Sequence, residues 1–415
     1  MQKTLFGLLC LLFTCSPVLA EESTTGKADF KKEQRGFSGP GSTSKQLTED
    51  DEIKSPALIF ESFDKALEPW FNWKSQLNTN VGLQLGVAYT SLFQSASDVP
   101  NGAEDTASSG IFRVSGRWNL LNAESGNTGN MVFSADHRHA YGAIAPADLG
   151  FAAGYLGIPG TLFNDTKTLL GDLNWQYSFN NGQSGLVMGR YDPNDFLDVL
   201  GYANPWTSFQ NLAILFNASI ALPDWGTGIG VGHWFNDQWY GLASISDANG
   251  VATETKLFHD TGELYKTAEF GWSPSRGERY FTNIHVTIWD ADERVDAGVP
   301  QSDGFTLSAN WTFNQKLMLF TKYGSSNGAA PLYNKSFTAG LIYYITKRTD
   351  LFGLAMNWGE PVGSNKDQVT TEMFYRLQLA QNLAITPSVQ LVSDPAANPD
   401  EDEILFAGVR VRFSF

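Results

Sequence analysis

Residues 404–415, ILFAGVRVRFSF, end the chain, and from Leu405 onward apolar and polar side chains alternate. Successive side chains of a β-strand point to opposite faces. One face of this strand would carry Leu405, Ala407, Val409, Val411, Phe413 and Phe415, and the other would carry Gly408, Arg410, Arg412 and Ser414. The stretch therefore predicts a strand with one apolar face and one hydrogen-bonding face.

The same period of two recurs along most of the chain. It predicts strands over residues 81–90, 111–121, 131–141, 168–179, 184–191, 225–235, 238–247, 264–272, 280–290, 304–313, 315–323, 335–345, 349–358, 370–379, 382–392 and 404–415. Short polar turns and long loops alternate between these strands, as in bacterial outer-membrane barrels. A further apolar piece, Phe209–Leu222, would break this alternation. We therefore place it in one long connection over residues 192–224, which could fold into the pore.

The apolar faces of so many strands need a large, continuous apolar environment. A lipid bilayer provides one, and only a closed sheet presents strands to lipid without unpaired backbone groups. Each strand is near the ~10 residues that cross an outer membrane when tilted. We predict an all-β fold, an antiparallel transmembrane β-barrel over residues 80–415, with about sixteen strands or, as the alternative count, about eighteen. Its polar faces would line a water-filled lumen, and a barrel this wide would have no dry core.

The residues before the barrel divide into three parts. Residues 1–20 have the charged start, apolar centre and small-residue end of a secretory signal peptide, which predicts an outer-membrane location. Residues 21–54 are polar and predict a flexible periplasmic arm. Residues 55–79 predict a short amphipathic helix, from Pro56 to about Glu68 before Pro69, and a lead-in to the barrel.

Composition excludes several functions. Both cysteines, Cys10 and Cys15, lie in the signal peptide, so the mature chain would have no disulfide and no cysteine metal site. The net charge of −16 argues against a nucleic-acid partner. Nothing in the sequence implies a cofactor.

Charged residues at inward positions form the candidate pore lining. Arginine offers five fixed hydrogen-bond donors, and carboxylates offer acceptors. Sugar hydroxyls both donate and accept hydrogen bonds. A lumen lined with both charges and with aromatic rings would therefore bind sugars, and weakly enough for flux. Internal salt bridges that only hold the wall together are an equal alternative for any one residue. The residues chosen are Arg113, Arg117, Asp136, Arg138 and Arg190 in strands, and Asp192, Asp195 and Trp206 in the long connection.

Several pieces resemble the carbohydrate-selective porins of the OprB type: residues 372–379, 385–391 and 394–399, and also 236–240 and 246–249. This resemblance implies passive diffusion of sugars, glucose among them, across the outer membrane, by a monomer or a homotrimer embedded in lipid and lipopolysaccharide. It implies that the terminal Phe415 is recognised by the barrel-assembly machinery. The arginine-rich eyelet of the family maps only loosely onto Arg113, Arg117, Arg138 and Arg190.

Two other functions are weighed against a sugar porin. A general or anion-preferring porin would have the same fold with a different selectivity. An outer-membrane barrel hydrolase would need a nucleophile, and Gly324–Gly328 matches a nucleophile elbow around Ser326 but has a predicted loop where that motif needs a helix. His137 and His139 share a face but have no obvious third metal ligand, and His139 has no evident serine partner. We expect no covalent chemistry and no metal site.

Overall fold

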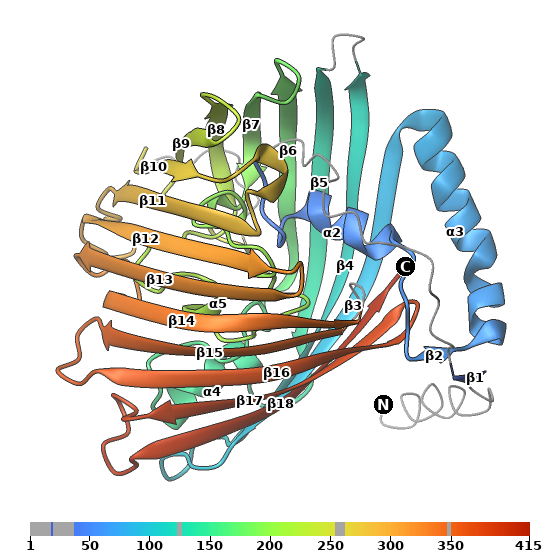
Figure 1. The fold of residues 1–415 in the computed structure, drawn as a ribbon. Helices are drawn as coiled ribbons and strands as arrows, with labels where there is room; N and C mark the ends of the chain where they lie inside the picture. The colour runs from blue at the N-terminus through green and yellow to red at the C-terminus, as the bar shows by residue number, and fades with distance from the viewer. Residues whose placement is uncertain (1–17, 20–36, 123–126, 254–261, 347–349) are drawn as a thin grey trace.

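A computed structural model describes residues 18–19, 37–122, 127–253, 262–346 and 350–415. Sixteen antiparallel strands, β3 to β18, form one closed barrel in the described chain, as the sequence predicts (Figure 1). The first eight are β3 (Leu83–Ala96), β4 (Thr106–Asn122), β5 (Thr128–Ala140), β6 (Lys167–Phe179), β7 (Ser184–Tyr191), β8 (Gly226–Trp234), β9 (Trp239–Asp247) and β10 (Leu264–Trp272). The last eight are β11 (Thr282–Ala291), β12 (Ser302–Phe313), β13 (Leu317–Asn327), β14 (Tyr333–Thr346), β15 (Asp350–Pro361), β16 (Gln368–Ala380), β17 (Leu383–Ser393) and β18 (Glu403–Ser414).

The barrel closes where the first and last strands pair. β18 runs antiparallel to β3, with Phe413 opposite Tyr89 and Phe406 opposite Ala96. The backbone of Phe415 exchanges two hydrogen bonds with that of Val87, at 2.7 and 3.0 Å. The pairing leaves no free edge in the ring of strands, and a free edge is the feature that lipid does not tolerate.

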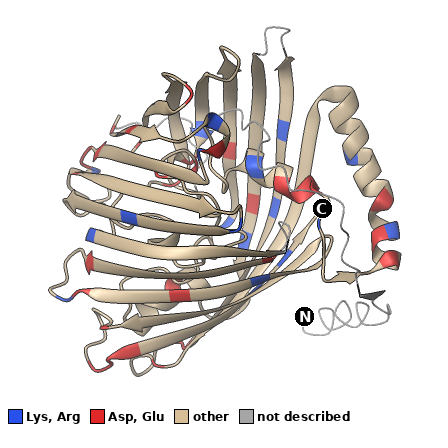
Figure 2. Ribbon diagram, in the orientation of Figure 1, with Lys and Arg blue, Asp and Glu red and all other residues tan. Residues whose placement is uncertain are grey.

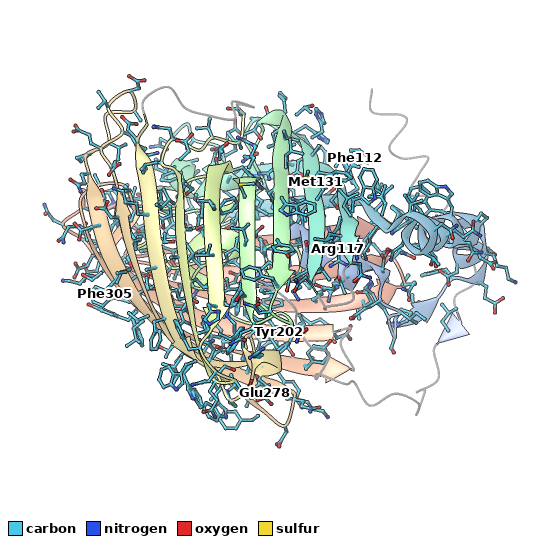
Figure 3. All side chains as sticks on the ribbon, turned by 90° about the horizontal axis from the view of Figure 1, so that it is seen from above. Phe112, Arg117, Met131, Tyr202, Glu278 and Phe305 are labelled. Carbon is cyan, nitrogen blue, oxygen red and sulfur yellow. The ribbon has the colours of Figure 1, made fainter. Side chains whose placement is uncertain are left out.

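The predicted facing of the terminal strand is confirmed. Leu405, Ala407 and Val409 are exposed on the outer surface, whereas Arg410 and Arg412 are buried inside the barrel. Other strands show the same division between an outer and an inner face. Phe305 projects outward from the barrel, whereas Arg117 lies toward the N-terminal part of the chain (Figure 3). Charged residues are sparse along the strands that face the viewer and frequent on the helices and at strand ends (Figure 2).

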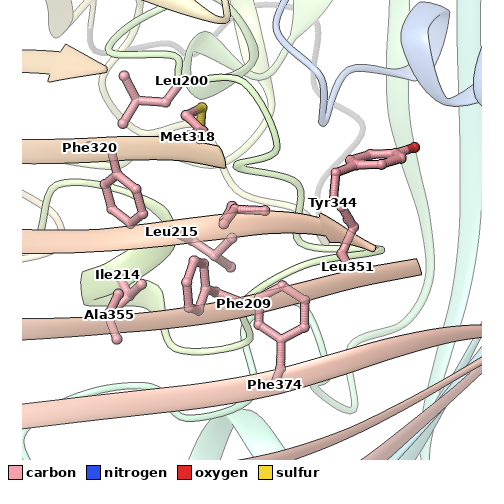
Figure 4. Close-up of a cluster of buried hydrophobic side chains, with 11 residues drawn as sticks. Leu200, Phe209, Ile214, Leu215, Met318, Phe320, Tyr344, Leu351, Ala355 and Phe374 are labelled. Atoms are coloured by element: carbon pink, nitrogen blue, oxygen red, sulfur yellow. The ribbon is translucent and has the colours of Figure 1, made fainter. Parts of the chain in front are cut away.

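The expectation of a lumen without a dry core is wrong. An apolar cluster inside the barrel joins the β7–β8 connection to β13–β16, with Phe209 stacked edge-on against Phe374 at 4.8 Å between ring centroids (Figure 4). The connection carries the short helices η1 (Pro193–Asp195) and α5 (Leu212–Leu215) and contains no strand. The sequence correctly places Phe209–Leu222 in this connection, but strand positions such as Phe320 and Phe374 are apolar and face inward.

Two other connections also carry helices. α4 (Pro146–Ala153) lies between β5 and β6, and its Leu149 is fully buried against Ile404 and Phe406 of the inner wall. η2 (Arg276–Glu278) lies in the turn between β10 and β11. None of the described helices is long and apolar enough to cross a membrane.

The N-terminal part differs from its prediction. Residues 37–53 do not form a flexible arm: helix α2 (Thr43–Asp51) lies inside the ring of strands, with Leu47 buried (Figure 1). The acidic run Glu49–Asp51 belongs to the stretch that was predicted to be a flexible arm. Its carboxylates are instead paired with basic residues of the barrel and of α3. Most of the predicted signal peptide lies outside the described residues, and its Val18–Leu19 forms β1, which pairs with β2 (Leu58–Ile59).

Helix α3 (Glu61–Val81) starts later than predicted and continues through Pro69. A proline inside a helix destabilises the helix by about 3 kcal/mol. The sequence therefore predicted that the helix ends before Pro69. The actual end is Gly82, which has a φ of 75° and caps the helix in the left-handed conformation that glycine tolerates. Beyond Pro69, the helix is held by Lys74, which is buried and pairs with Asp51 of α2 at 2.7 Å.

The outer surface of β12 gives a test of the membrane register. Leu307, near the middle of the strand, is 50% exposed to the outside. Leu307→Arg should destabilise the folded barrel in lipid by about 2–4 kcal/mol, because a charge would face the hydrocarbon core. Urea titration of the protein in vesicles, followed by tryptophan fluorescence, measures this loss.

Leu307→Ala is the control, since it removes the side chain without adding charge, and its effect should be smaller. Equal stability of Leu307→Arg and Leu307→Ala would contradict the lipid-facing assignment.

Candidate solute pathway

Ion pairs hold α2 in the lumen. Asp50 pairs with Arg412 at 2.7 Å, Glu49 with Arg376 at 3.7 Å, and Asp51 with Lys74 at 2.7 Å. Because the two arginines lie on β18 and β16, the acidic end of α2 neutralises inward charges of the wall. The helix is therefore a built part of the lumen lining.

The chain before α2 packs tightly on the β7–β8 connection. The Gly39 N–H donates to the Asp195 carbonyl, the Tyr280 hydroxyl donates to the Ser38 carbonyl at 2.6 Å, and Arg279 donates to the Phe37 carbonyl at 2.9 Å. A Cβ at Gly39 would collide with the side chain of Val199. Only glycine fits this approach, so residues 37–51, the N-terminal segment, cross the lumen in close contact with the connection.

Four of the eight predicted pore residues meet in one network. Asp136 lies between two arginines, at 3.3 Å from Arg113 and 2.8 Å from Arg138. The Arg113 guanidinium lies 4.7 Å from the ring centre of Trp206 and 3.9 Å from Asp172. Arg138 is 1% exposed. Since these groups bind one another and little solvent reaches them, the network is a packed part of the wall.

The other four are not paired within this network, although Asp192 and Asp195 line a small void beside Arg113 and Trp206. Arg190 donates to the carbonyls of Leu170 and Val251 at 3.0 and 2.9 Å. Arg117 donates to Gln84 at 2.9 Å and lines a separate cavity. Asp192 and Asp195 lie in the β7–β8 connection at the narrow part of the lumen.

This narrow part is acidic and nearly full. A void of about 40 Å³ is lined by Asp192, Asp195 and Asp198 together with Gly39, Gly41, Arg113 and Trp206. That volume holds about one water molecule at ~30 Å³ each. A sugar does not fit here while the N-terminal segment is in place.

Burial and mutual repulsion favour the neutral form of two of these carboxyl groups. Burial, together with repulsion from the carboxylates of Asp224 and Asp172, raises the pKa of Asp192 to about 7 against the opposing hydrogen bond from the Asn194 N–H. Burial, followed by the neighbouring Asp192 and Asp172, likewise raises the pKa of Asp195 well above its usual range. The negative charge of the constriction therefore depends on pH near neutrality.

A larger cavity lies between α2 and strands β4–β9. It measures about 280 Å³, close to the lower end of the ~300–1,000 Å³ of small-molecule sites. Arg117 was predicted, but the other polar lining was missed: Ser44, Lys45, Thr48, Asn130, Gln176 and Ser244. Sequence reasoning could not find Lys45, because it lies in the segment that composition assigned to a flexible arm.

The hydrolase alternative gains no support from its candidate residues. The Ser326 hydroxyl donates to the Tyr333 carbonyl at 3.0 Å, whereas His139 contacts the outward-facing Tyr89 hydroxyl at 3.1 Å. Ser326 and His139 therefore lie on opposite faces of the barrel wall. Among the described residues, no group of three or more His, Cys, Asp or Glu side chains is placed to hold a metal ion.

The buried network gives a second prediction. Asp136→Asn should cost about 3–5 kcal/mol of unfolding free energy, because Arg113 and Arg138 would lose the carboxylate between them while staying buried. Urea unfolding of the refolded barrel measures the loss.

Glu360→Gln is the matched control, since Glu360 pairs with Lys335 at the exposed surface, where a pair contributes about 0–1 kcal/mol. If both variants lose the same stability, Asp136 does not hold the wall together.

Comparison with known proteins agrees with this architecture. Residues 300–415 match the model of the carbohydrate-selective porin, OprB family. Porin AaxA of Chlamydia felis is 24% identical over 312 residues, which cover 72% of this chain and 69% of that protein. Porin AaxA of Chlamydia abortus is 22% identical over 72% of this chain and 68% of its own length.

Solved structures show the same fold. Pseudomonas putida OprB matches with a TM-score of 0.65 and 12% identity, over 83% of this chain and 97% of its own. A triple mutant of Rhodopseudomonas blastica porin matches with a TM-score of 0.52 and 15% identity, over 80% of this chain and 100% of its own. These solved structures show that the chain has the fold of a porin barrel, and its residues 300–415 are similar to the carbohydrate-selective porin, OprB family.

Proposed function

We propose that this porin lets sugars diffuse passively through its lumen across the outer membrane. The cavity of about 280 Å³ carries the proposal, because it has room for a small solute and its wall offers both donors and acceptors. The family match of residues 300–415 supports the same solute class.

The cavity lining suits a hydroxylated solute. Asn130 and Gln176 can each donate and accept, and Ser44 and Thr48 add hydroxyl groups from α2. The ring of Phe37 offers apolar surface for the C–H face of a sugar ring. Weak exchange of these hydrogen bonds with water allows a solute to enter and leave.

We assign the predicted arginines different roles along this path. Arg117 would contact the solute in the cavity, whereas Arg113 and Arg138 would position the wall beside the constriction through Asp136. Asp192, Asp195 and Trp206 would set the width of the constriction. Recognition of Phe415 by the assembly machinery, contact with lipopolysaccharide, and a monomeric or trimeric state remain predictions from the sequence.

Liposome swelling tests the proposed solute class. Vesicles that contain the refolded porin should swell faster in isotonic glucose than in an uncharged, non-sugar solute of equal size, and single-channel current should show saturable block by glucose. Equal swelling with all solutes, without block, would identify a general porin instead.

Transport through this path requires the N-terminal segment to shift. The segment lies against the β7–β8 connection and leaves only about 40 Å³ at the constriction, which is too little for a sugar. Its polar contacts, hydrogen bonds and ion pairs, can be exchanged with water, whereas the apolar contacts of Phe37 and Leu47 would be lost when the segment moves. We propose that the segment opens toward the periplasm during transport.

A disulfide between residues 39 and 199 tests this opening. A side chain at Gly39 would meet that of Val199, so Gly39→Cys with Val199→Cys is within reach of a disulfide. Glucose flux should fall severalfold in the oxidised double variant and recover on reduction, as measured by liposome swelling.

The single variant Val199→Cys is the control and should not respond to oxidant. If the cross-linked protein passes glucose at the unmodified rate, solutes do not need the N-terminal segment to move.

A further inference from the structure

Charge is divided between the two voids of the lumen. The constriction has three aspartates and one arginine among its lining residues, whereas the described residues that line the larger cavity include Lys45 and Arg117 but no aspartate or glutamate. The whole chain has 44 acidic and 28 basic residues, so an acid-free lining with two cations runs against its composition. This cavity is a local positive site in a negative protein.

Lys45 has no counter-charge within the described chain. It lines the cavity from α2 and forms no ion pair with a described carboxylate, since Glu49, one turn further along the helix, pairs with Arg376 of the wall. The charged groups that act on it are Arg117 of β4 and Arg279 of the β10–β11 turn, and both repel it. A cation held beside two others favours an anion from solution.

The neighbouring polar groups of the cavity are neutral. On α2, Thr43 donates to Asp172 at 2.6 Å, and Ser44 lies 3.4 Å from Gln176. The opposite wall supplies Asn130 of β5 and Ser244 of β9. The neutral lining residues do not cancel the charge of Lys45.

We infer that the larger cavity prefers a small sugar that carries one anionic group, either a carboxylate or a phosphate. Lys45 and Arg117 would bind the anionic group, while Ser44, Asn130 and Gln176 would bind the hydroxyls. This inference rests on the proposed function and specifies which sugars the site retains best. A charged solute would also reach the site more readily than a neutral one, because the basic lining attracts it.

Binding to the purified, detergent-solubilised porin tests the inference with defined probes. Glucuronate and glucose 6-phosphate represent the two anionic groups, glucose is the neutral analogue, and inorganic phosphate is the anion without a sugar. Isothermal titration or block of channel current should give at least one anionic sugar about tenfold tighter binding than glucose, equivalent to about 1.4 kcal/mol.

Lys45→Gln should remove most of this preference, measured as the ratio of anionic-sugar affinity to glucose affinity within the same variant. Lys65→Gln is the matched control: it makes the same charge change on the exposed face of α3, where Lys65 pairs with Glu61 at 3.6 Å. Lys45→Arg should retain the preference. Circular dichroism and heat-modifiable mobility establish that each variant is folded.

The pH dependence separates binding by Lys45 from general attraction. Burial, with repulsion from Arg117 and Arg279, lowers the pKa of Lys45 to about 8. The preference should therefore be full near pH 6.5 and decline as pH rises through 8, since the lysine loses its proton. The arginines keep their charge in this range. Lys45→Gln should show no such decline.

The outcomes separate the two proposals. If glucose binds and permeates but neither anionic sugar binds more tightly, or if Lys45→Gln changes nothing, the inference is overturned and the sugar porin stands. If inorganic phosphate binds as tightly as the anionic sugars, the site recognises the anion alone and the inference is also overturned. If no sugar binds or permeates, both proposals fail.

Discussion

The structure depends on one requirement: in lipid, every backbone N–H and C=O must have a partner within the protein. The pairing of β18 with β3 meets this requirement for the whole sheet, because it closes the ring. Once the ring is closed, each strand must place its apolar side chains outward, and the period of two follows along the chain. The outward positions of Leu307 and Val409 are consequences of this closure.

The inside of the barrel obeys a different rule. Nothing forces it to be uniformly wet, and the chain fills it with two segments from distant parts of the sequence. The β7–β8 connection brings Phe209 onto Phe374 and forms an apolar half, whereas the N-terminal segment brings acidic groups to Arg376 and Arg412. The proposed solute path is the space left between these two segments and the wall. Its two voids differ in both size and charge.

This difference explains what could be predicted from the sequence. The lipid-facing period depends only on residues close in the sequence, so all sixteen strands and the long connection after β7 could be predicted. For the same reason Asp136 and Arg138, two positions apart on one strand, were correctly placed on the same face. The position of α2 is not a local property. Its Asp50 pairs with Arg412, a contact between residues 362 positions apart, so a charge run typical of a solvated arm gave no sign of it. The inward direction of Phe320 could not be predicted for a similar reason. Its partner, Phe209, belongs to the β7–β8 connection and not to the alternating pattern of the strands.

The place of the N-terminal segment also constrains how the protein can be assembled. Residues 37–51 precede the first strand of the barrel, yet they lie inside it, and the seam that seals them in is made by the last strand of the chain. The polar bonds from α2 to β18 therefore tie the first part of the barrel's contents to the last strand of its wall, and they help to align the two edges that meet at the seam.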